Sequence, residues 1–105
     1  MKVSRTKADI AKVNAAVMLI FANGRCEDVR IALGSVAPTV IRAPKAEASL
    51  SGEKLDEKRI IRAAEIASEE AKPITDIGST MEYRKEMVRI LVRDSLKKAI
   101  ERAQS

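Results

Sequence analysis

The chain of 105 residues contains no histidine and a single cysteine, Cys26. The missing histidine excludes serine and cysteine nucleophiles that depend on an imidazole base, and it excludes zinc sites built on imidazole. One cysteine forms no internal disulfide and cannot hold an iron–sulfur cluster. The sequence therefore predicts no catalytic residue and no metal site in this chain. Cys26 is expected to be a structural thiol, because nothing near it in the sequence would clearly lower its pKa.

Aromatic residues and glycines are also few. Phe21 and Tyr83 are the only aromatic residues, so the core has to be built from aliphatic side chains and little is left to stack on a base or a flavin ring. The four glycines form neither a dinucleotide-binding fingerprint nor a phosphate-binding loop. The apolar run over residues 15–22 is too short to cross a bilayer, which takes about 20 residues. Since no apolar signal segment precedes it, a cytoplasmic protein is expected.

What the chain does have is charge. Twenty Lys and Arg residues stand against 15 Asp and Glu residues, which gives a formal net charge of +5 and a pI near 9.6. A basic balance of this kind suits nucleic acid or an acidic protein partner. No recognition motif for nucleic acid accompanies it, and aromatic platforms for single strands are missing. A small basic binding module without enzymatic activity is therefore the alternative function.

Strand patterns occupy the first part of the chain. Apolar residues fill both sides of an extended segment over residues 10–22, which predicts a central strand covered on two faces. The dipeptide Asn23-Gly24 predicts a tight hairpin turn, because both residues tolerate positive φ. The returning strand is expected over residues 26–33, and β-branched residues predict a third, short strand over residues 39–42.

Helix patterns follow. Pro44 suits the first turn of a short helix that ends before Gly52, and Asp56 is expected to cap a second helix running to about Lys72. A capping box at residues 79–82 begins a third helix that extends to about residue 103. Its apolar stripe is expected to contain Val88, Leu91, Val92, Ala99 and Ala103, widened by Met87, Leu96 and Ile100.

The order of strands before helices favours an α+β fold. We predict an antiparallel three-stranded sheet, made of the N-terminal hairpin plus one short strand, with about three helices packed on one face. Residues 1–8 are polar and basic and are expected to form a flexible lead-in. Residues 9–105 are then a single domain, which agrees with the usual size of one.

Five short segments stand out along the chain: Asp9–Val13, Arg30–Thr39, Arg42–Glu47, Pro73–Asp76 and Ser79–Arg84. Taken in their order and spacing, they resemble the C-terminal domain of the flavoprotein subunits of molybdenum hydroxylases. The resemblance covers about residues 8–100, and such a domain occurs in carbon monoxide dehydrogenase medium subunits, xanthine dehydrogenases and 4-hydroxybenzoyl-CoA reductases. In those proteins a larger FAD-binding domain precedes it and supplies the glycine-rich phosphate contacts, and no part of that domain is found in this sequence.

The resemblance implies a supporting role in electron transfer. In this family a molybdenum cofactor hydroxylates the substrate, and electrons pass through iron–sulfur clusters to FAD. The expected partners are an FAD-binding domain or subunit, a molybdenum-containing large subunit and an iron–sulfur small subunit. FAD would be shared with the missing domain, no cofactor is expected on the isolated chain, and the partner-facing surface would allow a homodimer when the chain is alone.

One residue carries a specific role over from the family. In xanthine-oxidising members the lysine of the same Asp-Ile-Ala-Lys-Val segment approaches the flavin ring, and this corresponds to Lys12. An ammonium beside the N1–C2 carbonyl edge stabilises the negative charge of reduced flavin and raises its potential. Without the resemblance, Lys12 is an exposed lysine near the start of a strand.

Overall fold

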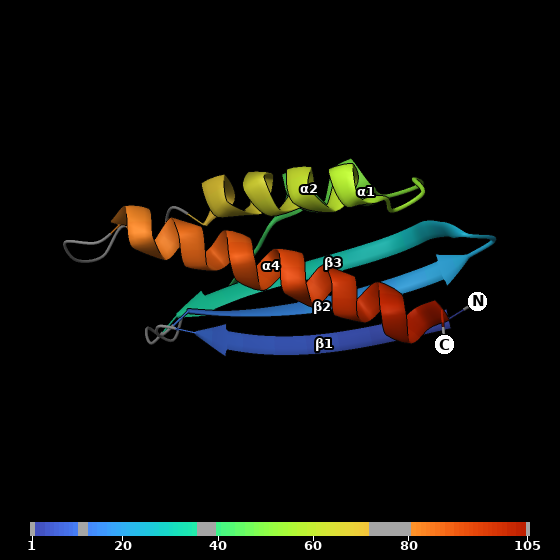
Figure 1. Ribbon diagram of the computed structural model, residues 1–105, viewed down its shortest axis with the longest axis horizontal. Coiled ribbons are helices and arrows are strands. Elements are labelled where there is room, and N and C mark those ends of the chain that lie inside the picture. The colour runs from blue at the N-terminus through green and yellow to red at the C-terminus, as the bar shows by residue number, and fades with distance from the viewer. Residues whose placement is uncertain (1, 11–12, 36–39, 72–80, 105) are drawn as a thin grey trace.

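The computed structural model describes residues 2–10, 13–35, 40–71 and 81–104. Within these ranges the chain forms four strands and then three helices (Figure 1). All neighbouring strands are antiparallel, in the order β1-β2-β3-β4. The predicted α+β class is confirmed. The elements are β1 (Lys2–Ile10), β2 (Val13–Ala22), β3 (Arg25–Ser35), β4 (Val40–Arg42), α1 (Pro44–Leu50), α2 (Glu57–Glu70) and α4 (Met81–Gln104).

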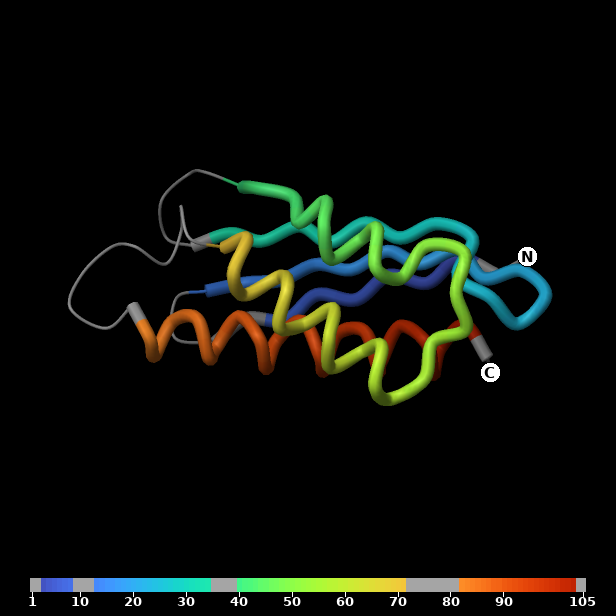
Figure 2. The backbone as a smooth tube through the Cα atoms, turned by 90° about the horizontal axis from the view of Figure 1, so that it is seen from above, coloured from blue at the N-terminus to red at the C-terminus, as the bar shows by residue number. Residues whose placement is uncertain are grey.

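The described helices all lie on one face of the sheet, as the order of elements predicted. Helix α4 packs on β1 and β2, α1 packs on β3, and α2 packs against the other two helices (Figures 1 and 2). The core is aliphatic apart from Phe21 and Cys26, because the sequence offers almost no aromatic side chains. The inward positions of the central strand are all buried: Val13, Ala15, Val17, Leu19 and Phe21.

The opposite side of β2 differs from the prediction. The sequence predicts a strand covered on both faces, because its outward positions are also apolar. In the structure Ala16, Met18 and Ile20 are only partly buried. No described helix covers this outer face of the sheet (Figure 1). The prediction was wrong because an apolar pattern on a strand does not say whether the second cover comes from the same chain.

Strand β1 is the main difference from the predicted fold. The sequence predicts a flexible lead-in over residues 1–8, but Lys2–Ile10 pair with β2 along their full length. The sheet therefore has four strands instead of three. The inward side chains of β1 include Ser4 and Thr6, which are buried beneath α4, and the Thr6 hydroxyl donates to the Ser95 carbonyl at 3.0 Å. Small polar residues at the inward positions hide the alternation that normally reveals a strand.

The local signals for turns and helix ends are confirmed. Asn23 and Gly24 adopt φ values of 55° and 75° between β2 and β3, as a tight hairpin turn requires. The Asp56 carboxylate caps α2 by accepting the backbone N–H of Arg59 at 2.8 Å. Gly52, with φ of 80°, follows the end of α1. Ser79, the first residue of the predicted capping box, lies outside the described residues.

The apolar stripe predicted for the last helix is also confirmed. On α2, Ile60, Ala64 and Ala67 are buried at helical spacing, as is Ala71 just after it. On α4 every predicted stripe residue except the half-buried Met87 is buried. Within the described part of the chain, no helix is both long enough and apolar enough to cross a membrane.

Candidate functional site

Described parts of three of the segments that carry the family resemblance lie at one end of the molecule. There β1 ends beside the start of β2, with Ile10 paired to Val13, and β3 ends beside the start of β4, with Gly34 paired to Val40. The last turn of α2 and the first turn of α4 lie at the same end (Figures 1 and 2). We call this region, formed by Ile10, Val13, Gly34, Val40 and the first turn of α4, the motif end. Parts of the chain that are far apart in the sequence are thus brought to the same end of the molecule.

Lys12 is the candidate flavin-contacting residue, and it lies outside the described residues. Its neighbours in sequence are placed: Ile10 and Val13 are cross-strand partners where β1 and β2 meet. Its role toward a flavin stays a prediction.

Two large apolar side chains are exposed at or near the motif end. Val40 in β4 is 70 % exposed, and Tyr83 in the first turn of α4 is 54 % exposed. Single exposed apolar residues are common on protein surfaces. These two, however, stand beside the segments that carry the resemblance. The motif end therefore carries exposed apolar side chains.

Gly34 is required by close packing near the same end. It is the cross-strand partner of Asn14, and a Cβ atom on Gly34 would lie 2.8 Å from Asn14 Oδ1. Real Cβ atoms do not approach another atom so closely, so the side chain of Asn14 would have to shift. Close packing against Asn14 therefore explains why a glycine stands at this position of the Arg30–Thr39 segment.

The Arg42–Glu47 segment also has a structural explanation. The Glu47 carboxylate is buried, and it accepts the backbone N–H of Ile31 at 2.9 Å. Arg42 donates to the same carboxylate at 2.5 and 3.1 Å. The hydrogen bond and the charge of Glu47 raise the pKa of Arg42. This cluster holds β3, β4 and α1 together, so the segment supports the fold.

Cys26 behaves as the sequence predicted. It is fully buried at the start of β3, and burial, followed by the nearby charge of Asp28, raises the pKa of its thiol to about 11. Its Sγ donates to the Asp28 carbonyl at 3.4 Å. A thiol with a raised pKa holds little thiolate near neutral pH and is a poor nucleophile. Cys26 is a structural residue.

The described residues do not form a complete cofactor site. No group of three or more His, Cys, Asp or Glu side chains among them is placed to hold a metal ion. The glycines with positive φ, Gly24 and Gly52, stand at the hairpin turn and after α1, and Gly52 N–H donates to the Cys26 carbonyl at 2.6 Å. A dinucleotide needs a cradle of backbone amides for its phosphates, and the described part of the motif end offers none.

Residues 1–99 match the family described as the CO dehydrogenase flavoprotein C-terminal domain. The nicotine 6-hydroxylase medium subunit of Paenarthrobacter nicotinovorans is 35 % identical over 96 residues, covering 91 % of this chain and 34 % of that protein. The carbon monoxide dehydrogenase medium chain of Afipia carboxidovorans is 32 % identical over 104 residues, covering 99 % of this chain and 36 % of that one. The chain thus spans about a third of the length of these relatives.

Solved structures show the same fold. Quinoline 2-oxidoreductase from Pseudomonas putida 86 superimposes with a TM-score of 0.85 at 29 % identity, covering 98 % of this chain and 39 % of that one. The Cu,Mo-CO dehydrogenase in its cyanide-inactivated form gives a TM-score of 0.83 at 27 % identity, covering 98 % and 38 %. Strand β1, which the sequence analysis assigned to a lead-in, belongs to the matched part of the chain.

Proposed function

The chain belongs to the family of CO dehydrogenase flavoprotein C-terminal domains, and on that premise we propose that it is a non-catalytic domain of the FAD-carrying medium subunit of a molybdenum hydroxylase-type oxidoreductase. The observation that carries this proposal is the family match over residues 1–99, nearly the whole chain. The relatives that share it include medium subunits of a nicotine hydroxylase and of a carbon monoxide dehydrogenase. In this role the domain works in the cytoplasm and performs no chemistry alone.

The domain's contribution to the flavin site is to close it. One observation supports this part of the proposal: described parts of three resemblance segments, around Ile10, Gly34 and the first turn of α4, lie together at the motif end. The glycine-rich contacts to FAD then come from another part of the medium subunit. Lys12 is the residue of this chain that we assign to the flavin edge, where its ammonium stabilises the negative charge of the reduced cofactor.

The partner subunits follow from the same assignment. Electrons would reach FAD from iron–sulfur clusters on a small subunit, and these clusters would be reduced by a molybdenum site on a large subunit. The domain then acts through its contacts, which position the flavin at the end of the series of redox centres.

The experiment that tests the proposal is a gentle purification of the tagged chain from its native host, with identification of partners and a visible spectrum. We expect co-purification with an FAD-binding polypeptide and with molybdenum and iron–sulfur subunits, together with flavin absorbance. A colourless chain that purifies alone would contradict the proposed function and leave the fold assignment intact.

A further inference from the structure

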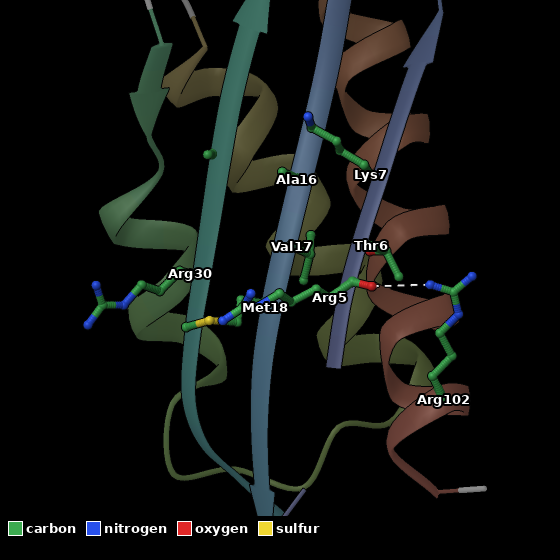
Figure 3. A pocket seen from close by; sticks show the side chains of 9 residues that line it. Arg5, Thr6, Lys7, Ala16, Val17, Met18, Arg30 and Arg102 are labelled. Carbon is green, nitrogen blue, oxygen red and sulfur yellow. Dashed lines mark hydrogen bonds between the residues drawn. The ribbon is translucent and has the colours of Figure 1, made fainter. Parts of the chain in front are cut away.

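The outer face of the sheet is a surface that the proposed function does not yet use. The strand register sets its side chains in rows. One row contains Arg5, Met18 and Arg30, on β1, β2 and β3 respectively (Figure 3). The next row contains Lys7, Ala16 and Ala32. We call these six residues the outer patch.

The centre of the outer patch is apolar. Ala16, Met18 and Ala32 are partly buried by their neighbours and have no cover from any described helix, and they line a shallow hollow of about 560 Å³. Ile20 continues the apolar strip along β2. An antiparallel sheet whose outer face contacts water normally carries polar residues there. Contiguous exposed apolar surface with a polar rim is typical of an interaction site.

The rim of the outer patch is cationic. Arg5 and Lys7 are exposed on β1, and neither forms an ion pair with any described residue. Arg30 has only a loose pair with Asp28, at 3.8 Å between half-exposed side chains. The helical side differs, since Arg89, Arg93 and Lys97 of α4 each pair with a carboxylate. The outer patch therefore suits a partner with an apolar centre and carboxylates around it.

A second copy of this chain fits the outer patch poorly. Two such patches placed face to face would bring Arg5, Lys7 and Arg30 of one copy against the same cations of the other. Like charges in contact are destabilising. The net charge of +5 adds to the repulsion. The complementary surface has to belong to a different, acidic region.

The size and composition of the outer patch fit a contact between domains of one subunit. Its largest apolar side chain is Met18, and it holds no aromatic residue of the kind that dominates tight complexes between separate proteins. Contacts between domains of one subunit are more polar than those between permanently associated proteins, so they need no aromatic anchor. The medium-subunit relatives are about three times as long as the part this chain matches.

We propose that the outer patch docks on an acidic surface of the FAD-binding part of the medium subunit. This inference rests on the proposed function and adds the surface by which the domain is held. Docking through this face of the sheet would fix the position of the motif end relative to the flavin site. Arg102, which donates to the Arg5 carbonyl at 3.1 Å, lies at the edge of the same hollow on the helical side of β1 (Figure 3).

Oxidation of methionine by hydrogen peroxide tests the proposal with an internal control. Met18 lies in the outer patch, and Met87 is a half-buried methionine on the helical side. Comparing the isolated chain with the purified flavin-containing complex, we expect oxidation of Met18 to slow about tenfold while that of Met87 changes little, because susceptibility follows exposure. Equal rates for Met18 in the two states would overturn the docking surface and leave the proposed function standing.

Charge reversal supplies the second arm. The double variant Arg5→Glu/Lys7→Glu should lower the flavin recovered per tagged chain by roughly tenfold, since it places carboxylates against carboxylates. The matched control Lys58→Glu/Lys98→Glu makes the same change in net charge on exposed helical positions and should recover flavin like the wild type. Equal recovery in the two variants would overturn the inference. So would a dimer of the isolated chain that protects Met18. Failure of the wild-type chain to bring down any flavoprotein would overturn the proposed function as well.

Discussion

The Glu47 carboxylate accepts the backbone N–H of Ile31 at 2.9 Å, which joins the first turn of α1 to a buried part of β3. Next to this bond, the Ala43 N–H donates to the Ile31 carbonyl at 3.0 Å. The pairing of β4 with β3 reaches only as far as Ala32. The two bonds to Glu47 and Ala43 therefore satisfy the N–H and the carbonyl of Ile31, which lies beyond that pairing. The Glu47 side chain takes the place of a strand partner here. This explains how the sheet can end with a fourth strand as short as β4.

Glu47→Ala should destabilise the fold by about 1–3 kcal/mol, because it leaves the buried N–H of Ile31 without an acceptor. Denaturant unfolding followed by circular dichroism measures the change. Arg42→Ala is the matched comparison, since it removes the other partner of Glu47 from an exposed position and should cost less. A loss for Arg42→Ala as large as that for Glu47→Ala would mean that the ion pair, not the bond to Ile31, stabilises this junction.

Leu91→Ala should destabilise the domain by about 2–5 kcal/mol, the usual range for truncating a buried leucine. Leu91 is 5 % exposed and lies on the stripe of α4 that contacts the core. Met87→Ala, one turn earlier and half-buried, should have a smaller effect. Thermal or urea unfolding of the three proteins provides the comparison. Equal stability of Leu91→Ala and the wild type would contradict the assigned stripe.

The features that the sequence predicted well are those set by neighbouring residues. The hairpin turn depends on Asn23 and Gly24, and the start of α2 depends on Asp56 and the amide of Arg59 three residues later. The stripe of α4 follows from helical spacing, whichever surface it packs against. Local chemistry decides each of these features, so no knowledge of the distant chain is needed.

Strand β1 could not be predicted in the same way, because its inward side chains depend on a distant helix. Thr6 is buried by α4, and its hydroxyl bonds to the carbonyl of Ser95, 89 positions away. On the outer side, Arg5 and Lys7 look like a charged tail in the sequence, although cations are a common feature of edge strands. The outer patch was missed for the same reason, since its rows exist only once β1 pairs with β2.

The assignment of Lys12 came from family resemblance, and no spacing in the chain suggests it.

The thiol of Cys26 should be unreactive in the folded protein near neutral pH. Burial raises its pKa from 9.0 to about 11, so the folded state favours the protonated form. A chromogenic thiol reagent should therefore react slowly with the native chain and rapidly once denaturant is added. Fast labelling of the native protein at pH 8 would show that the thiol is accessible and ionised, contrary to the structure.

The same shift in pKa predicts a dependence of stability on pH. The unfolded chain releases the thiol proton near pH 9 and the folded chain only near pH 11, so the contribution of Cys26 is complete below pH 9 and is lost as pH rises through this window. The relevant quantity is the difference in stability between the wild type and Cys26→Ala, because that difference isolates the contribution of this thiol. That difference should fall from pH 9 to pH 11, and a constant difference would contradict the shift.

Lys12→Ala in the assembled flavoprotein should lower the reduction potential of the flavin or change its reactivity, because it removes a positive charge that stabilises the reduced cofactor. Folding should be almost unchanged. Lys98→Ala is the matched control, since it removes an exposed lysine from the helical side and should leave the potential where it is. Spectroelectrochemical titration of the flavin compares the three proteins. If Lys12→Ala and Lys98→Ala both retain the wild-type potential and reactivity, Lys12 does not contact the flavin. The assignment of the chain to its family would be unaffected, because it rests on residues 1–99 as a whole.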